Sequence, residues 1–94
     1  MDKSTIIDLL RNSKDEFNID QFVLFGSFAK GTQKDGSDID IAYILQDGHK
    51  LNFDAFLKLE EKLVGSLKTK VDLMSFEKLN PLVKLNARKD FIYV

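Results

Sequence analysis

Apolar and polar positions in the first part of the chain predict a helix followed by a strand. Between residues 4 and 17 the apolar side chains recur near helical spacing, and Ser4 is placed to cap the helix. The segment 21–25 is short, aromatic and β-branched, which is typical of a buried strand. We expect this strand to stop abruptly at Gly26.

The central part combines a polar loop with a second apolar strand. Residues 27–30 predict the start of a short helix, and 31–37 form a polar loop that offers no core residue. The segment 38–45 alternates at its beginning and is continuously apolar later, so we expect a strand whose far end is buried on both faces. A turn at 46–50 follows this strand.

The last part adds two helices and a strand. Apolar residues between 53 and 67 mark a helix, and 70–74 predicts another short strand. Pro81 suits the first position of a last helix that begins near Asn80. This order of elements predicts one small α/β (α+β) domain over residues 1–94, with helices covering a small sheet. The last helix offers three apolar side chains for packing, namely Leu82, Val83 and Leu85.

Length, charge and composition narrow the functional classes. A chain of 94 residues has room for one hydrophobic core, and its 44% hydrophobic and 31% charged residues are ordinary for a soluble globular protein. The net charge of −1 gives no general attraction to polyanions, so a nucleic-acid partner is not expected. Because no signal-type or membrane-length apolar run is present, we expect a cytoplasmic protein without membrane association.

Two aspartates separated by one residue are the first candidates for chemistry. Asp38 and Asp40 lie on a predicted strand, so their side chains leave the same face, roughly 6.5 Å apart at the backbone. Mg²⁺ would turn the repulsion between such carboxylates into ligation by hard oxygens. Asp72 lies in the next apolar strand and would complete a three-aspartate cluster if the two strands are neighbours. Taken alone, an Asp-x-Asp sequence is more often a solvated turn, because such short motifs recur by chance.

A glycine–serine pair precedes the aspartates at the predicted junction of strand and helix. Gly26 permits close backbone approach, and amides at a helix start attract phosphate, while Ser27 adds a hydroxyl donor. A phosphate-binding turn followed closely by metal-binding carboxylates can hold a triphosphate and its metal together for in-line attack. The two motifs together therefore favour phosphoryl or nucleotidyl transfer.

The run GSFAKG at 26–31, followed after a five-residue spacer by SDID at 37–40, resembles the signature of the polymerase-β-type nucleotidyltransferase superfamily. The whole chain resembles its minimal branch, the MNT proteins. The resemblance implies a small mixed β-sheet flanked by helices. It also implies that Gly26 and Ser27 bind the triphosphate of ATP, and that aspartates hold Mg²⁺, with two ions expected. These metal-binding and catalytic residues would be Asp38, Asp40 and Asp72, the last helping to activate the acceptor hydroxyl.

Lys30 stands where this family more often has arginine. The positive charge is kept, but the bidentate fork that guanidinium offers to phosphate is lost. We assign Lys30 to the nucleotide-binding residues.

MNT proteins are commonly the antitoxin partners of HEPN-domain ribonucleases. The resemblance implies transfer of AMP from ATP to a tyrosine hydroxyl of such a toxin. A chain of this length leaves no residues for a separate acceptor-binding domain, which favours a protein acceptor. Two alternatives stay open: a non-catalytic antitoxin that neutralises its partner by binding, and a transferase for a small-molecule or RNA acceptor.

Overall fold

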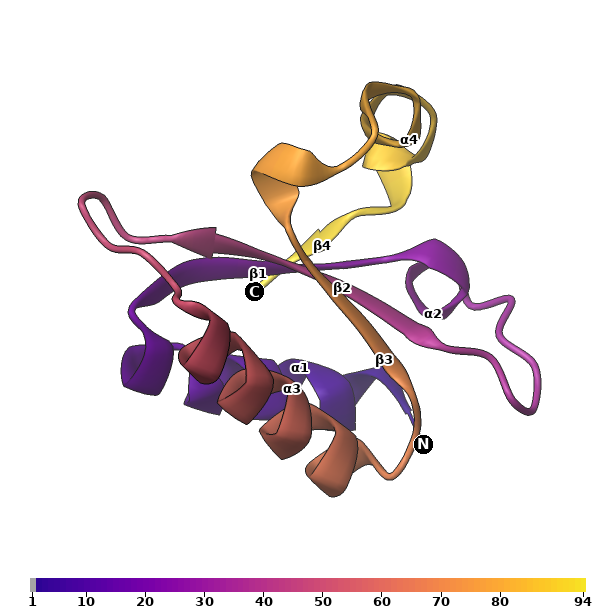
Figure 1. Ribbon diagram of the computed structural model, residues 1–94. Helices are drawn as coiled ribbons and strands as arrows, with labels where there is room; N and C mark the ends of the chain where they lie inside the picture. Colours follow the sequence, from indigo (N-terminus) through magenta and orange to yellow (C-terminus); the bar gives the residue numbers. More distant parts are fainter. Residues whose placement is uncertain (1) are drawn as a thin grey trace.

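Four strands form one mixed sheet in the order β3-β2-β1-β4 in the computed structural model, which describes residues 2–94 (Figure 1). Strand β1 (Ile19–Phe25) pairs antiparallel with β2 (Ile39–Leu45) and with β4 (Ile92–Tyr93). Strand β3 (Val71–Ser75) runs parallel to β2, so the chain must cross over between them, and it does so through a helix. The expected mixed sheet with flanking helices is confirmed.

Helices α1 (Lys3–Ser13) and α3 (Phe53–Leu67) lie together on one face of the sheet (Figure 1). Alternate strand residues point toward these helices, because successive side chains of a strand leave opposite faces. The main hydrophobic core lies in this layer, and α3 has the predicted bounds. Its fully buried residues include Ile6, Leu10, Phe22, Leu24, Ile39, Ile41, Leu59 and Leu63.

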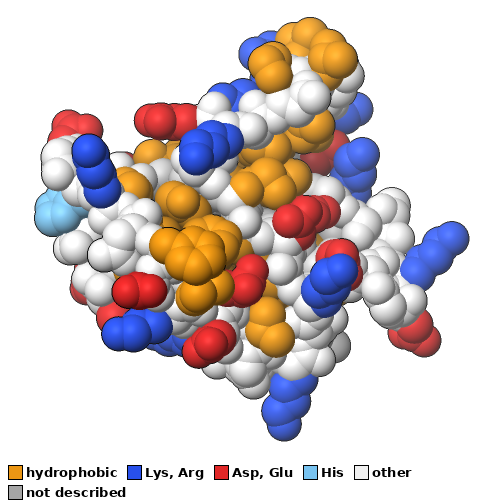
Figure 2. All heavy atoms as spheres, viewed as in Figure 1, with side chains coloured by type: hydrophobic (Ala, Val, Ile, Leu, Met, Phe, Trp, Pro, Cys, Tyr) orange, Lys and Arg blue, Asp and Glu red, His pale blue; other side chains and the backbone are white. Residues whose placement is uncertain are grey.

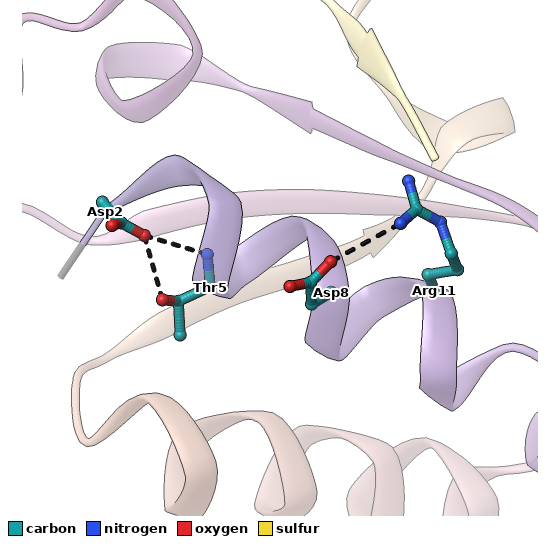
Figure 3. Close-up of polar contacts among 4 residues, drawn as sticks. All are labelled: Asp2, Thr5, Asp8 and Arg11. Carbon is teal, nitrogen blue, oxygen red and sulfur yellow. Dashed lines mark hydrogen bonds and ion pairs between the residues drawn. The ribbon is translucent and has the colours of Figure 1, made fainter.

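The first helix begins and ends earlier than the sequence predicts. Its N-cap is Asp2, whose carboxylate accepts hydrogen bonds from the backbone N–H and the hydroxyl of Thr5 (Figure 3), so the prediction of Ser4 as the cap was wrong. The helix stops at Ser13, and a 3₁₀ turn, η1 (Asp15–Phe17), follows. The turn still buries Phe17, which explains why its apolar spacing resembled a continuing helix.

The opposite face of the sheet carries a smaller hydrophobic cluster. Its buried members are Val23, Phe25, Ala42 and Leu79. Three short elements lie on or beside this face: η2 (Phe76–Lys78), α4 (Pro81–Ala87) and η3 (Arg88–Asp90). Helix α2 (Gly26–Lys30) follows β1 and buries Phe28 and Ala29 in the main core. Because the cover of the second face is partial, much of that face remains accessible, in contrast to the face under α1 and α3.

Two packing predictions were wrong for the same reason. The far end of β2, from Tyr43 to Leu45, is half-buried and not buried on both faces. Helix α4 begins at Pro81 as predicted, but it buries no residue, and its side chains Leu82 and Leu85 are 65% and 63% exposed. The second face therefore lacks the complete helical layer that the hydrophobic pattern suggested.

Strand β4 was not predicted from the sequence. It pairs with β1 over two residues, and Phe22 and Val94 exchange backbone hydrogen bonds of 3.0 and 2.8 Å. So short a strand has too few residues to display an alternating pattern. Across residues 2–94, none of the helices combines the length and the apolar character needed to cross a bilayer.

The two asparagine caps predict unequal stability losses. Asn52 accepts a 2.8 Å hydrogen bond from Ala55 N–H at the start of α3, which packs on the core. We expect Asn52→Ala to lower the free energy of unfolding by about 1 kcal/mol. Asn80→Ala removes the equivalent bond to Leu82 N–H, but it should cost less because α4 buries nothing. Urea denaturation of both variants checks this, and equal losses would contradict the peripheral role of α4.

Candidate active site

Asp40 and Asp72 lie directly beside each other on neighbouring parallel strands. Their Cα atoms are paired in the β2–β3 register, so both side chains leave the same face of the sheet. Ile39 and Ile41 point into the core under the helices, which places Asp40 on the opposite, accessible face. The adjacency of the two strands, which the sequence could only suggest, is confirmed.

Asp38 lies one residue before β2, two positions from Asp40. The backbone there is held by a 3.0 Å hydrogen bond from Ile39 N–H to the carbonyl of Lys70, the residue before β3. The Lys70 ammonium lies 3.9 Å from a carboxylate oxygen of Asp38, and both side chains are well exposed. A surface ion pair of this kind contributes little to stability, but it puts a positive charge at the edge of the aspartate cluster.

The carboxylates at this end of the sheet influence one another. The pKa of Asp40 is raised above its ordinary value, first by partial burial and then by the negative charges of Asp72 and Asp38. The carboxylates of Asp38 and Asp72 therefore lie close enough to Asp40 to disfavour its ionised form. A bound cation would relieve the repulsion, since an opposite charge favours the ionised carboxylate.

Position 26 requires glycine because the backbone there lies against the Asp40 side chain. The φ of Gly26, +74°, lies in the left-handed region, and a Cβ atom at this position would collide with the Asp40 carboxylate. The contact arises because Phe25, the residue before it, pairs with Asp40 across β1 and β2. The sequence showed a glycine near a strand end, but its steric role depends on a strand register that no local pattern reveals.

The remaining predicted nucleotide-binding residues lie on α2. Ser27 is half-buried in the turn that begins at Gly26, and Lys30 is exposed at the last position of the helix. The N-terminus of α1 is tied to this helix because the Lys3 ammonium donates a 3.2 Å hydrogen bond to the carbonyl of Ala29. The fold thus brings the glycine–serine turn to the same end of the sheet as the aspartates, whereas Lys30 lies at the other end of α2.

The donor set suits a magnesium ion that is shared with a substrate. Within residues 2–94, no three His, Asp or Glu side chains converge closely enough to form a complete protein cage for a metal. Mg²⁺ does not require such a cage, because it is usually held by one or two carboxylates together with substrate phosphates and water. Asp40 and Asp72, paired on neighbouring strands, would supply two such carboxylates.

The aspartates line an accessible face and not a deep cavity. Two surface depressions, of about 600 and 590 Å³, are lined by other segments. One lies between 33–37 and 67–69, beside the loop that leads to Asp38, and the other lies between 43–51 and 75–78. A substrate would therefore approach the aspartates from the open face of the sheet.

Sequence relatives match nearly the whole chain. A relative in Methanocaldococcus jannaschii is 38% identical over 96 residues, covering 97% of this chain and 96% of that protein. Protein adenylyltransferase MntA of Shewanella oneidensis is 38% identical over 74 residues, covering 79% of this chain. The match spans only half the length of MntA, so the activity of that whole protein does not transfer automatically to this chain.

Solved structures share the fold. A toxin–antitoxin complex crystallised with AMP-PNP contains a chain that matches with a TM-score of 0.65 and 32% identity. A complex of a tri-AMPylated HEPN toxin with its MNT antitoxin, from Shewanella oneidensis, matches with a TM-score of 0.61 and 26% identity. The matches cover 88% and 96% of this chain, but 64% and 66% of those chains.

The family model for polymerase β nucleotidyltransferases matches residues 4–94 and so includes the glycine–serine turn and all three aspartates. The expected fold, a small mixed sheet flanked by helices, agrees with that match. The chain belongs to the polymerase β nucleotidyltransferase family.

Proposed function

We propose that the chain is a Mg²⁺-dependent protein adenylyltransferase that transfers AMP from ATP to a tyrosine hydroxyl of a HEPN-type toxin, and so acts as its antitoxin. The observation that carries the proposal is the register pairing of Asp40 with Asp72, with Asp38 two residues away and Gly26 in contact with Asp40. The relatives support it, since they include a protein adenylyltransferase and an antitoxin bound to an AMPylated toxin.

Each residue has a defined role in this proposal. Gly26 and Ser27 would hold the triphosphate through backbone amides and a hydroxyl, and Asp38, Asp40 and Asp72 would hold two Mg²⁺ ions. These ions supply neutralisation of phosphate charge and orientation of the reacting oxygens when bound. Lys30, exposed on α2, adds a positive charge at the rim of the nucleotide site. We place the protein in the cytoplasm, where ATP and Mg²⁺ are both available.

The chemistry is an in-line displacement at the α-phosphorus of ATP. The tyrosine oxygen of the acceptor forms a bond to phosphorus, the bond from phosphorus to the β-phosphate oxygen breaks, and pyrophosphate leaves. Asp72 is exposed, whereas Asp40 is half-buried. We therefore propose that the acceptor hydroxyl approaches Asp72, which takes up its proton. Asp40, half-buried against Gly26, fixes the position of the nucleotide.

Intact-mass spectrometry of the partner tests the proposal. The chain is incubated with ATP, Mg²⁺ and a candidate HEPN partner protein, and the mass of that protein is followed over time. Additions of one or more AMP units, absent with Asp38→Asn, are the expected result, and Asp54→Asn on the outer side of α3 is the control. A stable complex without any mass gain would instead identify a non-catalytic antitoxin, and AMP found only on RNA or a small molecule would reject a protein acceptor.

A further inference from the structure

Helix α4 is the least buried helix of the structure and presents apolar side chains to solvent. None of its seven residues is buried, and Leu82 and Leu85 are 65% and 63% exposed. A helix this short gains little from intrinsic propensity and normally depends on packing of an apolar face. Figure 1 shows α4 projecting from the sheet on the side away from α1 and α3. A partner that buries the exposed face of α4 would therefore stabilise the helix.

This face borders an apolar depression of about 360 Å³. Pro81, Lys84, Leu85 and Arg88 follow helical spacing along one side of it, and three aromatic rings form the other side. The rings are packed edge to face: the centroid of Phe91 lies 5.8 Å from that of Phe76 and 6.3 Å from that of Tyr93. Such preorganised aromatic surfaces are common at the centre of protein interfaces. We call the depression together with Leu82 the α4 surface.

Positive charges surround the α4 surface. The Lys84 ammonium lies 4.9 Å from the centroid of the Phe76 ring, and Arg88 and Lys89 follow in η3. Asp90 is the one acid of that turn, and the ion pairs found among residues 2–94 include neither Lys84 nor Arg88. Figure 2 shows Lys and Arg side chains (blue) beside the hydrophobic side chains (orange) at the place of α4. A binding partner with both apolar and carboxylate side chains would be complementary to the apolar residues and the positive charges of this surface.

The α4 surface is continuous with the aspartate site. Phe91 packs against Phe25 with centroids 6.0 Å apart, and Phe25 is the register partner of Asp40. Turn η3 also lies against α2, which carries the glycine–serine turn. A macromolecule that covers the α4 surface would therefore reach over the same open face that holds the aspartates.

We propose that the α4 surface is the docking site for the protein acceptor, which binds it through an amphipathic segment that carries carboxylates. This inference rests on the proposed transfer to a protein. Docking there would hold the acceptor over the open face of the sheet that carries the aspartates. It also explains why an apolar helix is left exposed next to a catalytic site, since the acceptor buries it during the reaction.

Binding and kinetics with the HEPN protein test the docking site. Leu85→Glu should weaken binding, measured by calorimetry, and raise the KM for the HEPN protein by about tenfold or more, with kcat at saturating acceptor changed less than twofold. Arg88→Glu should lower the association rate and reduce its dependence on salt. Phe53→Glu is the matched apolar control, because Phe53 is 73% exposed on the opposite helical layer. Lys58→Glu is the matched charge control.

The possible outcomes separate the two proposals. Wild-type transfer with an unchanged KM in Leu85→Glu overturns the docking site and leaves the transferase intact. Binding without transfer in the wild type rejects the transferase, while loss of that binding in Leu85→Glu still supports the docking site. A wild-type dimer that dissociates in Leu85→Glu, seen by analytical ultracentrifugation, or binding of tRNA that this variant abolishes, would assign the surface to a second copy or to RNA and overturn the proposal.

Discussion

Asp40→Asn is expected to abolish AMP transfer and, at the same time, to raise the thermal stability of the metal-free protein. Activity should fall by roughly 10³-fold or more, because the neutral amide cannot supply the charge that holds the metal and the nucleotide. Stability should rise because the Asp40 carboxylate is partly buried beside Asp72 and Asp38, which makes its ionised form costly in the folded state. A transfer assay and thermal unfolding in EDTA measure the two effects.

The sign of the stability effect follows from the direction of the pKa shift. The pKa of Asp40 is higher in the folded protein than in the unfolded chain, so its contribution to stability is present at low pH and is lost as the pH rises through the folded value. At neutral pH the wild type therefore carries a cost that Asp40→Asn removes. The stability difference between the two proteins should shrink as the pH falls below about 4, near the ordinary pKa of aspartate.

Magnesium and a matched variant distinguish this result from a general effect of lost charge. Added Mg²⁺ and ATP should raise the melting temperature of the wild type but not that of Asp40→Asn, because binding to the folded state stabilises it. Asp54→Asn removes a carboxylate from the first turn of α3 and should keep full activity. Near-normal transfer by Asp40→Asn would reject the assigned role of this residue.

Gly26→Ala is expected to reduce transfer by about a hundredfold with a much smaller loss of folding. The added Cβ would collide with the Asp40 carboxylate, so the side chain must move, and a displacement of about 1 Å in a catalytic group can cost this much activity. The positive φ of Gly26 adds a destabilisation of about 1–2 kcal/mol for any residue with a Cβ. Steady-state kinetics measures the loss of transfer activity, and urea denaturation measures the loss of folding stability.

Gly31→Ala is the matched control for this substitution. Gly31 has a similar φ of +78°, but a Cβ there meets nothing within 4 Å. It should therefore show the backbone cost alone and keep its activity. The steric account also predicts that Gly26→Ala costs less stability in an Asp40→Ala background than in the wild type. Equal losses in both backgrounds would show that the contact between these residues is not the cause.

Strand alternation predicted that Asp38 and Asp40 share one face, but β2 begins only at Ile39, so Asp38 lies just outside the strand. The sequence also predicted α3 and β3 closely, since their apolar patterns are long or clearly bounded. The pairing of Asp40 with Asp72 needed the parallel β2–β3 neighbourhood, which depends on the crossover through α3. The collision that keeps position 26 a glycine depends on the β1–β2 register and was invisible for the same reason.

The errors concern residues whose surroundings the hydrophobic pattern cannot reveal. Leu82 and Leu85 have the spacing of a core helix, but α4 projects from the sheet, so the same spacing marks a surface. The two-residue strand β4 depends on backbone pairing with β1, including the bonds between Phe22 and Val94, which has no side-chain signature in the sequence. The cap at Asp2 lies just before the apolar period begins, where Ser4 was an equally acceptable chemical choice.

The most direct test of the site is a crystal structure with Mn²⁺, which scatters anomalously, and a non-hydrolysable ATP analogue. The account predicts anomalous density between Asp40 and Asp72, with the triphosphate against Gly26 and Ser27. Both signals should be absent from Asp40→Asn crystals grown in the same way. Metal and nucleotide bound elsewhere, or triphosphate bound without metal at the aspartates, would contradict the claim that these residues form one nucleotidyl-transfer site.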